Sequence, residues 1–86
     1  MVDNWNDFEL RLKDILKYTK YTYEVYKYLC LVLIKENNDI KAYIDFTANA
    51  YSITKEPDFN IGIINWDKLV DLVENTDCES LWEDGK

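Results

Sequence analysis

Residues 40–49 alternate between apolar and polar side chains at every position. The apolar members are Ile40, Ala42, Ile44, Phe46 and Ala48. A two-residue period is typical of a β-strand with one buried face, because successive side chains of a strand point to opposite sides. The preceding segment, residues 28–34, is apolar throughout and includes β-branched side chains that suit a strand. The two segments are therefore predicted to form a β-hairpin.

The residues between the two arms predict the turn and the pairing. Asn37 and Asn38 tolerate the left-handed backbone that tight turns need. Closing the hairpin there pairs residues whose numbers sum to 75, as 33 and 42 do. This register places six apolar side chains on one face: Leu29, Leu31, Leu33, Ala42, Ile44 and Phe46. It also sets Glu36 against Asp39, and this like-charge pair is predicted to open into a four-residue loop.

Two other segments have the three- and four-residue spacing of amphipathic helices. The first is capped by Asp3 or Asn4, ends near Tyr18, and has a buried stripe of Trp5, Phe8, Leu12, Ile15 and Leu16. The second is capped by Asn65, ends at residues 75–77, and has a stripe of Trp66, Leu69, Val70 and Val73. Between the hairpin and this helix, residues 52–58 break the pattern at Pro57, and residues 59–64 are predicted to form a third strand.

The predicted fold is α+β, with the order α-β-β-β-α. Both helices are expected on the leucine face of a three-stranded antiparallel sheet. Residues 18–23 could be loop, strand or helix, and residues 21–36 also fit a helical stripe, so a mostly α-helical bundle is the alternative. Residues 1–86 are expected to be one small acidic domain, in which residues 78–86 form a further turn or a flexible acidic tail.

Charge is distributed unevenly along the chain. The net charge is −7; residues 1–55 contain eight acids and eight bases, whereas residues 56–86 contain nine acids and two lysines. On the closing helix, Asp67, Asp71 and Glu74 fall within about 60° of one another at 100° per residue. Neighbours at this spacing lie about 5–6 Å apart, comparable with phosphates along a nucleic-acid strand. The array is either the solvent face of an amphipathic helix or a surface for a basic groove.

The residue types argue against catalysis and metal binding. The chain has no histidine, Ser52 and Ser80 lie in no nucleophile motif, and no glycine-rich phosphate loop is present. Cys30 and Cys78 form no C-x-x-C motif, and a disulfide between them is an open alternative to two free thiols. The chain is therefore expected to be a non-enzyme without cofactor or metal. Because the start is acidic and the longest apolar run is short, a cytoplasmic location is expected.

The predicted element order resembles that of double-stranded-RNA-binding domains. Those domains need lysine contacts to phosphate, whereas the closing helix here presents Asp67, Asp71 and Glu74. Direct binding of nucleic acid is therefore not expected.

In size, acidity and predicted element order the chain resembles small phage-encoded inhibitors, such as anti-CRISPR proteins and other DNA mimics. The resemblance is one of overall character and implies no residue roles. It implies a counter-defence protein that blocks the basic nucleic-acid-binding surface of a nuclease complex. An immunity protein or antitoxin that neutralises a basic nuclease, or an acidic homodimeric adaptor, would have the same character.

Two candidate binding surfaces follow. The predicted partner-binding residues are Asp67, Asp71, Glu74, Asp77, Glu79, Trp82, Glu83 and Asp84. Trp is a favoured anchor at protein interfaces, which is why Trp82 is included. The uncovered sheet face, with Tyr28, Val32 and Tyr43, is the second candidate, for self-association or an apolar partner.

Overall fold

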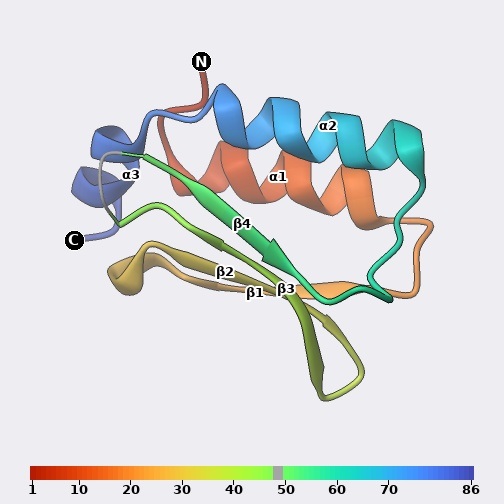
Figure 1. The fold of residues 1–86 in the computed structure, drawn as a ribbon. Helices are drawn as coiled ribbons and strands as arrows, with labels where there is room; N and C mark the ends of the chain where they lie inside the picture. The colour runs from red at the N-terminus through yellow and green to blue at the C-terminus, as the bar shows by residue number, and fades with distance from the viewer. Residues whose placement is uncertain (48–49) are drawn as a thin grey trace.

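The computed structural model describes residues 1–47 and 50–86, which form a four-stranded antiparallel sheet with helices on one face (Figure 1). The elements are α1 (Trp5–Leu16), β1 (Thr22–Tyr26), the 3₁₀ helix η1 (Lys27–Leu29), β2 (Leu31–Glu36), β3 (Asp39–Asp45), β4 (Ser52–Lys55), α2 (Ile63–Glu74) and α3 (Cys78–Asp84). The strands lie in sequence order, β1-β2-β3-β4.

The predicted α+β class with an antiparallel sheet is confirmed, but the finer topology is wrong. The sheet has four strands rather than three, and two helices follow it, so the order α-β-β-β-α does not hold. The mostly helical alternative is also wrong, because residues 21–36 contain β1, η1 and β2. The likeness to double-stranded-RNA-binding domains depended on the predicted element order, so the observed order no longer supports it.

Helix α1 forms as its sequence predicts. The Asn4 side chain accepts a hydrogen bond from the Asp7 backbone N–H at 2.8 Å, which satisfies one of the free donors of the first turn. All five predicted stripe residues are buried. Helix propensity, cap and apolar stripe agree here, so local sequence is enough to place this element.

The predicted hairpin register is wrong for most of its length, because β1 was not recognised as a strand. The observed pairs sum to 76, as in Val32 with Ile44 and Ile34 with Ala42. One β-branched row then crosses all four strands beneath the helices: Val25, Val32, Ile44 and Ile53. Leu31 and Leu33 lie on the outer face instead. If Leu33 lay beneath the helices, Glu24, which pairs with it across β1 and β2, would be buried beneath them as well.

The turn between β2 and β3 is tighter than predicted. Asn37 adopts a left-handed φ of 56°, and Glu36 pairs with Asp39, so the loop has two residues rather than four. The like-charge pair is eased by Lys20, whose Nζ lies 3.4 Å from the Glu36 carboxylate. The register shifts at Ile34/Lys35, a β-bulge that moves Ile40 to the outer face, where it is exposed. Ala48 and Asn49, the end of the predicted second arm, lie outside the described residues.

The third strand lies earlier than predicted. Residues 52–55 form β4, whereas residues 59–62 are a connecting loop and Ile63 begins α2. Phe59 and Ile61 are still buried; the Phe59 ring lies 4.8 Å from that of Tyr21. Gly62, with φ of 85°, caps α2 in place of Asn65, because only glycine adopts this backbone conformation without strain.

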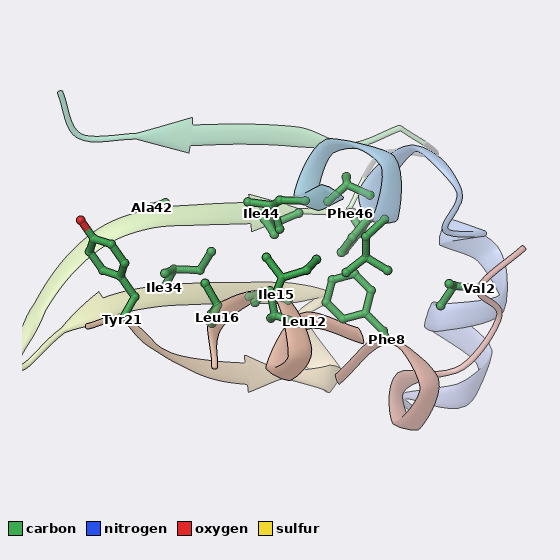
Figure 2. Packing of buried hydrophobic residues seen from close by; sticks show 14 of the residues in the cluster. Val2, Phe8, Leu12, Ile15, Leu16, Tyr21, Ile34, Ala42, Ile44 and Phe46 are labelled. Carbon is green, nitrogen blue, oxygen red and sulfur yellow. The ribbon is translucent and has the colours of Figure 1, made fainter. Parts of the chain in front are cut away.

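The core lies between the sheet and the two long helices (Figure 2). At one end, the rings of Trp5, Phe8 and Phe46 meet edge to face, with centroids 5.5–6.2 Å apart. Helix α3 closes this end, because Leu81 is buried and its carbonyl accepts a hydrogen bond from the Trp5 indole at 3.0 Å. Residues 78–84 are thus a helix that contributes to the core. Within residues 1–47 and 50–86, no helix is long and apolar enough to cross a bilayer.

Candidate protein-binding surface

Three of the predicted carboxylates lie along the outer ridge of α2. The helix buries Leu69, Leu72 and Val73 against the core, so Asp67, Asp71 and Glu74 are exposed on the opposite side. Glu74 accepts a hydrogen bond from the Tyr51 hydroxyl at 3.0 Å, and this bond raises the pKa of that hydroxyl. The structure therefore places these three acids together on one solvent-facing surface.

Two predicted binding residues of the C-terminal segment have structural partners. Asp77 caps α3, since its carboxylate accepts from the Ser80 backbone N–H at 3.2 Å. Asp84 accepts from the Trp5 backbone N–H at 2.8 Å, which places a negative charge at the positive end of the α1 dipole. Glu79 is exposed, and Glu83 lies 3.4 Å from the Lys86 ammonium.

The tertiary structure adds an acid that the sequence did not indicate. Val2 forms a β-bridge with Thr76, and its backbone bonds to Asn75 and Asp77 at 2.7 and 2.8 Å. This bridge carries Asp3 to a shallow depression that is otherwise lined by α3 and its cap: Asp77, Glu79, Ser80, Trp82, Glu83 and Asp84. No local pattern marks Asp3, because its neighbours come from the other end of the chain.

Five of the eight bases in residues 1–55 pair with acids of the same segment, whereas Lys41 pairs with Asp58 of the second segment at 2.9 Å. Five ion pairs of 2.9–3.6 Å join Arg11 to Asp7, Lys17 to Asp14, Lys20 to Glu36, Lys27 to Glu9 and Lys35 to Glu24. The hydrogen bond and charge of Lys17 lower the pKa of Asp14. Among the described residues, no basic side chain lies within ion-pair distance of Asp67, Asp71, Glu74 or Glu79. The acidic ridge therefore forms no ion pair within the described part of the chain, although Arg11 and Lys68 line the same hollow as Asp71.

The acids of α2 lie where the helix dipole opposes them. The helix has no acid in its first turn, no base in its last turn, and no side-chain cap at Gly62. Asp71 and Glu74 lie near its negative C-terminal end, where a negative charge is unfavourable. Asp67 with Asp71 and Asp71 with Glu74 are like-charge neighbours at four- and three-residue spacing, which is also destabilising.

The second predicted surface is not formed. Val32 is fully buried beneath the helices, Tyr28 lies on η1, and Tyr43 points to the outer sheet face, so the three residues share no surface. The outer face instead presents Leu31 and Leu33 from β2, beside Tyr43.

The two cysteines are free thiols rather than a disulfide. Burial raises the pKa of Cys30, with smaller contributions from Cys78 and Asp45, and burial also raises the pKa of Cys78. Both thiols are therefore protonated at neutral pH, which disfavours a nucleophilic role. In the described ranges, no three metal-binding side chains come together.

No protein-family model, curated protein or solved structure matches the chain. The function of the chain is therefore inferred from its residues and their geometry alone.

Proposed function

We propose that the chain is a non-enzymatic binding protein whose acidic α2–α3 surface docks into a basic groove of a partner protein. The observation that carries the proposal is the ridge of Asp67, Asp71 and Glu74, which forms no ion pair among the described residues. Six of the eight bases of residues 1–55 pair with other acids, so the ridge keeps negative charge that can attract a partner. Carboxylates about 5–6 Å apart have a spacing similar to that of phosphates along a strand.

The position of these acids supports a role in binding rather than in folding. Helix stability would favour acids at the start of α2 and bases at its end, whereas Asp71 and Glu74 occupy the opposite end. Local arrangements that oppose stability are expected mainly at functional sites. The simpler interpretation, a solvated helix face, provides no reason for this placement.

The specific function that we propose is inhibition. Nucleases and other nucleic-acid-processing complexes present basic grooves to phosphate backbones. An acidic protein seated in such a groove excludes the nucleic acid, as a phage-encoded counter-defence protein would require. Electrostatic attraction would speed its association, and binding should weaken as salt rises.

The test is charge reversal on the ridge. The immobilised protein is used to capture partners from nuclease-treated lysate of the source cell. Each purified partner is then bound to a labelled DNA duplex, and we measure whether adding the acidic protein releases that duplex. We expect Asp67→Lys/Asp71→Lys to weaken capture at least about tenfold, because several charge pairs are lost together. Raising the salt to about 0.5 M should release the wild-type partner, because exposed charges are then screened within a few ångströms.

The matched control is Asp39→Lys/Glu56→Lys, which changes the net charge equally at exposed acids outside α2 and α3. It should retain the partner. Equal capture by both double variants, with unchanged circular dichroism, would show that the ridge is not the docking surface. A captured partner that keeps its DNA would contradict inhibition while leaving binding intact.

A further inference from the structure

We infer that the cleft between η1 and α3 receives an apolar anchor side chain from a lysine- or arginine-rich segment of the partner. The inference rests on the proposed function, since it names the partner feature that the acidic surface recognises. Tyr28, Leu29 and Cys30 line the cleft from the η1 side, Trp82, Gly85 and Lys86 line it from the α3 side, and Thr47 completes the lining.

The cleft is held open by specific backbone and side-chain contacts. The Trp82 indole donates to the Phe46 carbonyl at 2.9 Å, which fixes the orientation of the ring. A Cβ on Gly85 would lie only 2.6 Å from the Lys27 carbonyl oxygen, so glycine allows the end of α3 to approach η1. Cys30 ends η1 in a left-handed conformation with φ of 51° and is buried. Both sides of the cleft are thus preformed, which lowers the entropic cost of binding.

Large apolar side chains beside the cleft are exposed to solvent. Tyr28 is 87% exposed and Leu29 is 54% exposed, whereas the next residue, Cys30, belongs to the buried core. Tyr and Trp are enriched among the residues that contribute most to binding energy, because they bury much area at a low entropic cost. Tyr28, Leu29 and Trp82 together provide an aromatic and aliphatic site of this kind.

The charge around the cleft indicates the chemistry of the occupant. Trp82 also lines the acidic depression that contains Asp3, Glu79 and Glu83, so the apolar cleft and this depression lie on either side of one residue. Of the two cations at the cleft, Lys27 lies 3.6 Å from Glu9, and Lys86, which is part of the lining, lies 3.4 Å from Glu83. An apolar side chain flanked by lysine or arginine complements both features, whereas a nucleic acid would be repelled.

The experiment uses two synthetic seven-residue peptides and the full chain. One peptide has six lysines around a central leucine, and the other has serine in place of the leucine. Titration is followed by the NMR cross-peaks of the Trp82 indole and of the Tyr28 and Leu29 amides. We expect the leucine peptide to shift these peaks and to bind about tenfold more tightly than the serine peptide, because one leucine side chain becomes buried.

Matched variants locate the site. Tyr28→Ala/Leu29→Ala should lower the affinity for the leucine peptide to that of the serine peptide. The control is Tyr18→Ala/Leu10→Ala, which removes the same residue types from α1 and the residues after it, at exposures of 91% and 60%. It should leave the affinity unchanged.

Two failures have different meanings. If both peptides bind equally and their shifts map to Asp67 and Asp71, the cleft is not an anchor site and the acidic docking surface is retained. If neither peptide binds at low salt, and the ridge reversal also leaves partner capture unchanged, the proposed function fails together with the cleft.

Discussion

Helices α1 and α2 lie side by side on one sheet face, yet their charges are arranged in opposite ways (Figure 1). Both have 12 residues and bury one apolar stripe. In α1, Asn4 caps the start, Asp7 lies in the first turn, Lys13 lies in the last, and Arg11 pairs with Asp7. In α2 these features are absent, and acids occupy the exposed ridge and the C-terminal end.

The charged side chains of α1 pair with one another and complement the helix dipole, so the exposed face of α1 is close to electrically neutral. Among the described residues the acids of α2 form no such pairs, and under the proposed function they are the groups that attract a partner. Three measurements test this difference between α1 and α2.

The largest effect should come from the apolar anchors of the two helices. Trp5 is fully buried, contacts Phe8 and Phe46, and donates to the Leu81 carbonyl. We expect Trp5→Ala to lower the free energy of unfolding by about 3–5 kcal/mol. Trp66 is only partly buried, so Trp66→Ala should lower it by about 1–2 kcal/mol. Urea denaturation measures both values; equal losses would show that the two helices are anchored alike.

A smaller effect is expected where α3 meets α1. Asp84 accepts from the Trp5 N–H, so Asp84→Ala should cost about 1 kcal/mol through the lost bond and the lost dipole interaction. Glu79 is exposed on the same helix, and Glu79→Ala should change stability by less than about 0.5 kcal/mol. Thermal unfolding of the two variants gives the comparison. A loss on Glu79→Ala as large as that on Asp84→Ala would contradict the assigned role of Asp84.

The smallest effect should have opposite signs in the two helices. Asp71→Lys places a cation near the C-terminal end of α2 and removes two like-charge contacts, so we expect stability to rise by about 0.3–1 kcal/mol. Lys13→Glu makes the reverse change in the last turn of α1 and should lower stability by a similar amount. Denaturation at low ionic strength measures both. If Asp71→Lys is destabilising, the ridge contributes to folding and the contrast between the helices fails.

Much of the fold could be predicted where local signals agree. The cap and stripe of α1, the position of the turn at Asn37–Asn38, and the end of α2 near Asn75 each depend on residues close together in the chain. The face of the hairpin could not be predicted from two strands alone. Both faces of β2 are apolar, and the choice between them depends on Glu24 in β1, a strand that the sequence left undecided.

Some features of the candidate site follow from the sequence, and others depend on tertiary contacts. The confinement of the net negative charge to residues 56–86 and the helical spacing of Asp67, Asp71 and Glu74 are properties of the sequence alone. Only the tertiary structure gave Asp84 an internal partner, brought Asp3 to α3, and placed Tyr28 beside Trp82. The physical reason is range: periodicity and charge are local, whereas pairing, burial and neutralisation depend on contacts between residues as many as 79 positions apart.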